Sequence, residues 1–116
     1  MTNKESTRYY SNEHEKSICK ALGGYQNSNS GAGKFTGGDI TISDADMLIE
    51  AKCSMTEKTS FSIKQQWLDK IKEEAFETGK SNTALCFRFS PNSPNYYIID
   101  EKLMKYLVDK IREDLI

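Results

Sequence analysis

The chain has 116 residues, a formal net charge of −1 and a pI near 5.9. A chain of this length forms one domain with a core large enough to fold unaided, so we expect a single domain over residues 1–116, with residues 1–10 as a flexible tail. The charge excludes a strongly cationic protein that coats DNA, but it leaves room for a local surface that binds phosphate.

Cysteine and histidine are too few for a disulfide framework or a zinc site. The three cysteines, Cys19, Cys53 and Cys86, are an odd number without paired spacing, which fits reduced thiols in a cytosol. The single histidine, His14, is flanked by acids and is predicted to lie on the surface. No apolar stretch approaches the roughly twenty residues that span a bilayer, and the N-terminus lacks the apolar core of a signal peptide. We therefore expect a soluble, intracellular protein with no membrane partner.

The first third of the chain predicts a helix followed by a loop. Residues 11–22 have helical spacing, with Glu13 and Glu15 in the first turn, where the helix dipole favours acids. The glycine pair 23–24 ends this helix. Residues 25–38 are rich in Gly, Asn and Ser and have no apolar period, which predicts a loop with a short edge strand at its beginning.

The middle of the chain predicts a hairpin and a second helix. Residues 39–43 and 47–53 have strand character and are joined by a turn at 44–46. A helix is expected over 62–78, because apolar residues recur there at helical spacing: Ile63, Trp67, Leu68, Ile71, Ala75 and Phe76. We expect Trp67 to belong to the core.

The last third predicts two strands and a closing helix. The strands cover residues 83–89 and 96–99, separated by a turn that contains two prolines. The final segment has an apolar stripe formed by Leu103, Met104, Leu107, Val108, Ile111 and Leu115. This stripe would cover the sheet by default, or form a dimer interface. The complete order is α-β-β-α-β-β-α, which predicts an α/β fold with a mixed β-sheet flanked by helices.

Asp39 and the tripeptide Glu50-Ala51-Lys52 lie on the two strands of the predicted hairpin. Two carboxylates can hold a hard divalent cation, and an ammonium beside them can orient an attacking water. Glu50 and Lys52 project from one face of their strand, which leaves the Ala51 carbonyl at the strand edge. Taken singly, Asp39 could merely cap a turn, and the Glu/Lys pair could be a solvated strand face. However, the apolar residues 47–49 predict a strand buried on both sides, where a charged pair is costly without a cation.

The ordered set of an acidic helix, Asp39 and Glu50-x-Lys52 resembles the PD-(D/E)XK nuclease superfamily, and within it the Holliday-junction resolvases of archaea and related small phage-encoded endonucleases. The first-helix pattern of those resolvases is matched at residues 15–22, with Glu15 in the acidic position. Phage-type members are also similar at 22–24, 29–32, 38–40, 60–63, 67–68 and 74–75. One departure is that Gly38, rather than proline, precedes Asp39.

The resemblance implies a restriction-endonuclease-like fold and a metal-dependent endonuclease that acts on DNA as a homodimer, with four-way junctions as substrate. It implies Mg²⁺, replaceable by Mn²⁺, held by Asp39, Glu50 and the Ala51 backbone carbonyl, with Glu15 contributing directly or through water. Lys52 would position the hydroxide, and the product would carry a 5′-phosphate. It also implies a role in DNA recombination in the cytoplasm of a bacterial host, with a phage or mobile-element origin.

Contacts to DNA phosphates are expected outside the metal site. The candidates are Lys34 and the backbone of Ser28, Ser30 and Gly31 in the loop, together with Lys64 at the start of the second helix. Other functions stay open: a restriction-like, nicking or flap nuclease, a catalytically silent DNA-binding module, or a small inhibitor or adaptor. The silent module would be favoured if Asp39, Glu50 or Lys52 were missing, and all three are present. The inhibitor or adaptor leaves the Asp…Glu-x-Lys arrangement unexplained.

Overall fold

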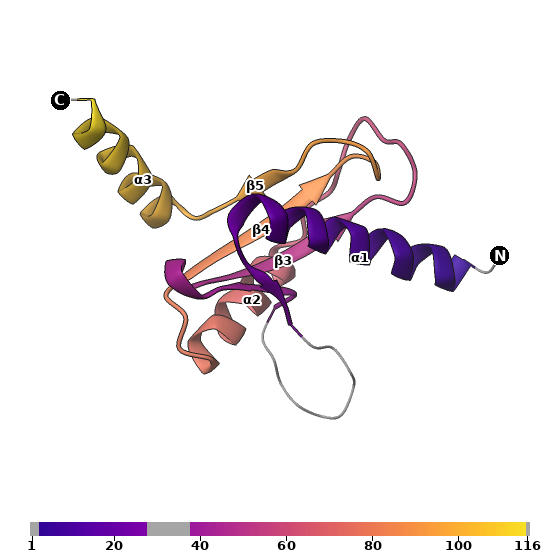
Figure 1. Cartoon of the computed structure of the whole chain (residues 1–116), viewed down its shortest axis with the longest axis horizontal. Coiled ribbons are helices and arrows are strands. Elements are labelled where there is room, and N and C mark those ends of the chain that lie inside the picture. The colour runs from indigo at the N-terminus through magenta and orange to yellow at the C-terminus, as the bar shows by residue number, and fades with distance from the viewer. Residues whose placement is uncertain (1–2, 28–37, 116) are drawn as a thin grey trace.

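The computed structural model describes residues 3–27 and 38–115, with side chains from Tyr9 onward. Five strands form one sheet, and three helices accompany it (Figure 1). The elements are α1 (Asn3–Leu22), β1 (Tyr25–Gln26), β2 (Ile40–Ile42), β3 (Met47–Cys53), α2 (Gln65–Glu77), β4 (Asn82–Arg88), β5 (Tyr96–Ile98) and α3 (Glu101–Asp114). A short 3-10 turn, Ser43–Ala45, joins β2 to β3. The α/β class, the edge strand and the hairpin are confirmed.

The sheet is mixed, with the strand order β1-β2-β3-β4-β5. Neighbouring strands are antiparallel except for β3 and β4, which are parallel and paired from Met47↔Asn82 to Cys53↔Arg88. A parallel pair needs a crossover connection, and α2 provides it. The long central strands β3 and β4 therefore form the rigid centre on which the other elements are placed.

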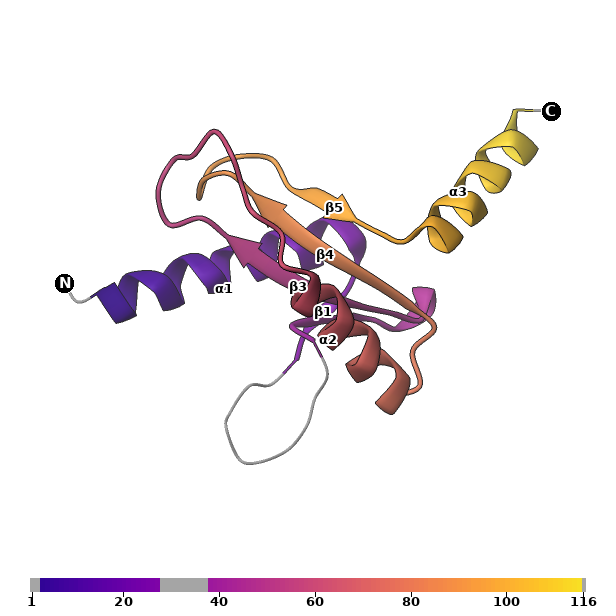
Figure 2. The same cartoon turned by 180° about the vertical axis from the view of Figure 1, so that it is seen from behind.

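Strand β3 is buried on both faces, as its apolar run predicted. On one face Ile49 packs in a cluster with Ile18 of α1 and Cys86 of β4. On the other face Leu48 packs with Ile71 and Ala75 of α2. Figure 1 shows α1 in front of the sheet, and the reverse view in Figure 2 shows α2 in front. Since side chains alternate along a strand, Glu50 and Lys52 share the α2 face with Leu48.

Helix α1 begins at Asn3, so the predicted start near Ser11 and the flexible tail over residues 1–10 are wrong from Asn3 onward. Residues 3–10 contain no Gly or Pro, and nothing in their covalent structure interrupts a helix. Glu13 and Glu15 consequently lie well inside the helix and not in its first turn. The N-terminal half of α1 extends past the edge of the sheet (Figure 1).

His14 is buried, with 1% of its surface exposed, so its predicted surface position is wrong. It lies one helical turn before Ile18, on the side of α1 that packs against the sheet, and its Nε2 is 3.5 Å from Cys86 Sγ. Burial, followed by the nearby Arg88 cation, lowers the pKa of His14 to about 4. The acidic neighbours that suggested exposure lie on other sides of the helix.

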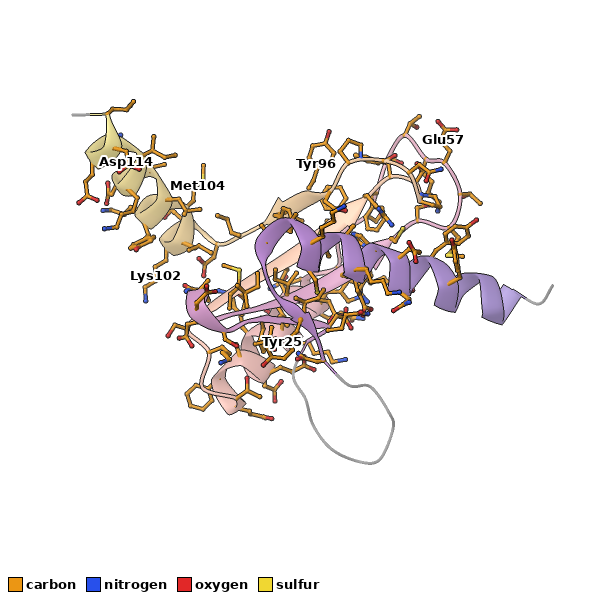
Figure 3. All side chains as sticks on the ribbon, in the orientation of Figure 1. Tyr25, Glu57, Tyr96, Lys102, Met104 and Asp114 are labelled. Carbon is orange, nitrogen blue, oxygen red and sulfur yellow. The ribbon has the colours of Figure 1, made fainter. Side chains whose placement is uncertain are left out.

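Helix α3 does not cover the sheet, and none of its residues 101–114 is buried. It projects from the body of the protein, with Met104 and Asp114 away from the sheet (Figure 3), whereas Lys102 at its base lines a pocket with the turn between β2 and β3. Its base is fixed by Asp100, which accepts a hydrogen bond from Leu103 N and pairs with Lys72 of α2 at 2.7 Å. The stripe residues Met104, Leu107, Ile111 and Leu115 are exposed. The default expectation that this helix covers the sheet is wrong.

No helix in the described part of the chain is both long and apolar enough to cross a membrane.

Candidate active site

The candidate site lies where β2 begins and β3 continues beyond it. The ladder between these strands ends at Ile40↔Ile49, and Asp39 N donates one further hydrogen bond to Ile49 O at 3.0 Å. The Asp39 side chain then takes the place of the next backbone partner, because its Oδ2 accepts a hydrogen bond from Ala51 N at 2.8 Å. In a strand the N–H and C=O of one residue face the same edge, so the Ala51 carbonyl faces the side that β2 has left.

Glu50 and Lys52 lie side by side on the face covered by α2. Lys52 Nζ is 3.5 Å from Glu50 Oε2, and the two side chains are 30% and 18% exposed, respectively. Lys52 Nζ also lies 4.6 Å from the ring centroid of Trp67 on α2. The ammonium is thus held between a carboxylate and an indole ring, which fixes its position far better than a free surface lysine.

Glu50 is in an environment that disfavours its negative charge. Burial and then the neighbouring Asp39 carboxylate raise the pKa of Glu50 to about 7, although Lys52 acts in the opposite direction. The crowding of two carboxylates is unfavourable unless a proton or a cation lies between them. A divalent cation would remove this repulsion, which is the first reason why the residues fit a metal.

Glu15 approaches the same group from α1. Burial raises its pKa, and the Asp39 carboxylate raises it further, while a hydrogen bond from Gln26 acts in the opposite direction. That bond joins Gln26 Nε2 to Glu15 Oε1 at 3.1 Å. Glu15 is therefore close enough to interact with Asp39, but it is held by β1 and not by Glu50. This position suits contact through a water better than direct ligation.

The donor set also fits magnesium. Within residues 9–27 and 38–115, no three Asp, Glu, His or Cys side chains converge tightly enough to make a metal cage on their own. Mg²⁺ does not require one, because it keeps several waters and uses one or two carboxylates together with phosphate oxygens of the substrate. Asp39, Glu50 and the Ala51 carbonyl match that pattern.

The backbone conformation at position 38 explains why glycine, and not proline, precedes Asp39. The φ of Gly38 is +63°, which proline cannot adopt because its ring holds φ near −65°. Its N–H also donates to Glu74 Oε1 at 2.6 Å, and proline lacks that donor. A Cβ here would come within 2.9 Å of Ile71 Cδ1. Glu74, which the sequence singled out only as part of the resemblance, thus positions the segment that carries Asp39.

Of the predicted DNA contacts, only Lys64 is within the described residues; Ser28, Ser30, Gly31 and Lys34 lie outside them. Lys64 is the N-cap residue of α2, and its Nζ lies 5.8 Å from the Trp67 ring centroid. Trp67 is half-buried rather than fully in the core, and its ring lies near the ammonium groups of both Lys52 and Lys64. Its spacing of three residues from Lys64 is the signal that could have identified it.

No family model, curated protein or solved structure matches this chain. The likeness to PD-(D/E)XK nucleases therefore stays a hypothesis that depends on the residues and their geometry.

Proposed function

We propose that the chain is a Mg²⁺-dependent DNA endonuclease with a restriction-endonuclease-like fold. The observation that carries this proposal is the convergence of Asp39, Glu50 and Lys52 around the strand edge of Ala51. Each group has the property that phosphodiester hydrolysis needs: two crowded carboxylates, a carbonyl at an unpaired edge and a positioned ammonium. A solvated strand face would not place a carboxylate with a pKa near 7 beside a second carboxylate.

The cation would be held by Asp39, Glu50 and the Ala51 carbonyl, with Glu15 reaching it through water, and Mn²⁺ could replace it because it accepts the same oxygen ligands. When bound, it supplies neutralisation of the charge that builds up on the phosphate. The Lys52 ammonium donates a hydrogen bond to the attacking water and aligns it with the phosphorus. The water loses a proton to bulk solvent, its oxygen forms the new P–O bond as the bond to O3′ breaks, and O3′ takes up a proton from a solvent water. The products are a 5′-phosphate and a 3′-hydroxyl.

We propose that the substrate is branched DNA, as for a Holliday-junction resolvase, and that the chain acts as a homodimer. A four-way junction requires two symmetric cuts, which a two-fold dimer can make. The exposed stripe of α3 supports a second copy as its partner. Each end of α3 carries charges of both signs, and Lys105, Lys110 and Arg112 are paired with acids of the same helix. Two antiparallel α3 helices would therefore associate through the exposed apolar stripe. Their helix dipoles would also oppose favourably.

The test is a cleavage assay with end-labelled four-way junction, Y-fork, linear duplex and single strand, in Mg²⁺ or EDTA. Wild type is compared with Glu50→Ala and with Glu77→Ala, which removes an exposed glutamate at the end of α2. We expect paired nicks in the junction from wild type and Glu77→Ala, and at least a hundredfold less from Glu50→Ala. Cuts confined to the fork or the duplex would contradict the resolvase proposal and would indicate a flap or restriction-like nuclease instead. Identical patterns from Glu50→Ala and wild type would refute a nuclease.

A further inference from the structure

Arg88, at the end of β4, is a buried cation that has no carboxylate partner among the side chains that the structure describes. Only 7% of its surface is exposed. Its Nε is inaccessible and has no hydrogen-bond partner, and no Asp or Glu side chain in residues 9–27 or 38–115 pairs with its guanidinium. An unpaired buried charge costs several kcal/mol, and proteins rarely keep one without a partner.

The groups that surround Arg88 do not supply the missing negative charge. His14 is held neutral, because burial and Arg88 itself lower its pKa to about 4. The Cys86 thiol is also neutral, because burial raises its pKa to about 12 despite the neighbouring guanidinium. Glu13 is exposed and makes no ion pair with Arg88. The site is therefore cationic at neutral pH, and it is open to an anion from outside the chain.

A pocket gives such an anion access. It has a volume of ≈ 310 Å³ and lies between α1 and the loop that joins β4 to β5. Besides Arg88, the polar residues that line it are Tyr9, Tyr10, Glu13, Ser17, Asn92 and Ser93. Tyr9 and Tyr10 belong to the part of α1 that extends beyond the sheet, so this extension builds one wall. Ser93 Oγ shares a 2.6 Å hydrogen bond with Ser90 Oγ in which either can donate, so its hydroxyl can be redirected to a ligand.

We propose that this pocket binds a phosphate group, with Arg88 as the cationic anchor. Because Nε is inaccessible, the two terminal nitrogens of the guanidinium are the donors that can meet phosphate oxygens, and hydroxyl groups add further donors. The volume lies at the lower end of the roughly 300–1,000 Å³ of small-molecule sites, which suits a phosphomonoester better than a polymer backbone. The ligand is therefore either the phosphate group of a small molecule or the 5′-terminal phosphate of a nucleic-acid strand.

The phosphate site is separate from the candidate nuclease site. Arg88 pairs with Cys53, the residue after Lys52, so both sites lie near the same end of the sheet. However, Arg88 shares its strand face with Cys86 and packs toward α1, whereas Glu50 and Lys52 face α2. Phosphate binding therefore does not require the nuclease proposal to hold.

The test is the binding of inorganic phosphate to the full chain, measured by calorimetry and by thermal unfolding in phosphate against chloride at equal ionic strength. Wild type should bind saturably and unfold at a higher temperature in phosphate. Arg88→Met should weaken binding at least tenfold, whereas Arg112→Met, at an exposed arginine of α3, should bind as wild type does. Arg88→Lys keeps the charge without the fork and should bind with intermediate affinity, which covers the case that Arg88→Met does not fold.

Competition identifies the source of the phosphate. A 5′-phosphorylated oligonucleotide that displaces inorganic phosphate, while its 5′-hydroxyl counterpart does not, would assign the pocket to strand ends; displacement by mononucleotides alone would assign it to small molecules. Glu50→Ala should bind phosphate normally, so a failed nuclease assay leaves this result intact. The proposal is overturned if wild type behaves alike in phosphate and chloride, or if the Arg88 variants bind as tightly as Arg112→Met.

Discussion

Replacing Glu50 by glutamine tests the electrostatics of the candidate site through protein stability, with no need for an activity assay. The folded protein binds a proton at Glu50 more tightly than the unfolded chain does, because the pKa rises from the ordinary 4.5 to about 7. A raised carboxyl pKa contributes stability that is fully present below pH 4.5 and is lost as the pH rises through 7. The ionised carboxylate therefore destabilises the folded protein above pH 7. Glutamine, which never ionises, should remove this effect.

The magnitude follows from the same values. The difference between 4.5 and about 7 corresponds to roughly 3 kcal/mol, because one pKa unit is about 1.4 kcal/mol. Glu50 has a side chain that is only 18% exposed, so solvent screens this energy little. In a domain of this size, roughly 3 kcal/mol raises the melting temperature by about 10 °C.

The measurement is urea unfolding of wild type and Glu50→Gln from pH 4 to pH 8 in EDTA. We expect the free energy of unfolding of the variant to exceed that of wild type at pH 8 and to approach it at pH 4. Glu77→Gln is the matched control and should follow wild type throughout. Added Mg²⁺ at pH 8 should stabilise wild type more than Glu50→Gln. Parallel stability curves for wild type and Glu50→Gln across this pH range would show that Glu50 is not desolvated beside Asp39.

Three further predictions concern other parts of the molecule. The pKa of His14 is lowered to about 4, so the stability that the neutral imidazole contributes is present above pH 6.5 and is lost as the pH falls through 4. This loss of roughly 3 kcal/mol in the free energy of unfolding should occur in wild type but not in His14→Gln. Identical acid denaturation of the two proteins would contradict the burial of His14. Lys52→Met should lower kcat at least a hundredfold and should change the emission of Trp67, the single tryptophan, since the ammonium lies over its ring; full activity would rule out the positioning role. Glutamate at both Leu107 and Ile111 should convert a dimer to a monomer in light scattering, and a monomeric wild type would refute the α3 interface.

Sequence patterns were most reliable where structure depends on neighbouring residues. The bounds of β3 were predicted as residues 47–53 because an apolar run between turn residues has few other solutions. The proximity of Asp39 to Ala51 and Glu50 followed from the hairpin, since a short turn fixes which residues lie opposite each other. By contrast, the predicted stripe of α2 included Phe76, which is 87% exposed. Helical spacing identifies one side of a helix, but it does not say how wide the covered stripe is.

The sequence by itself determined the element order, the hairpin and the set Asp39, Glu50 and Lys52, because periodicity, turn chemistry and residue type are local properties. Only the tertiary structure decided that His14 is buried and that α3 stands away from the sheet. It also decided that Arg88 lines a pocket and has no counter-ion among the described side chains. Each of these depends on which distant segments meet, and in this chain the meeting of α1 with the end of β4 creates an environment that neither segment encodes alone.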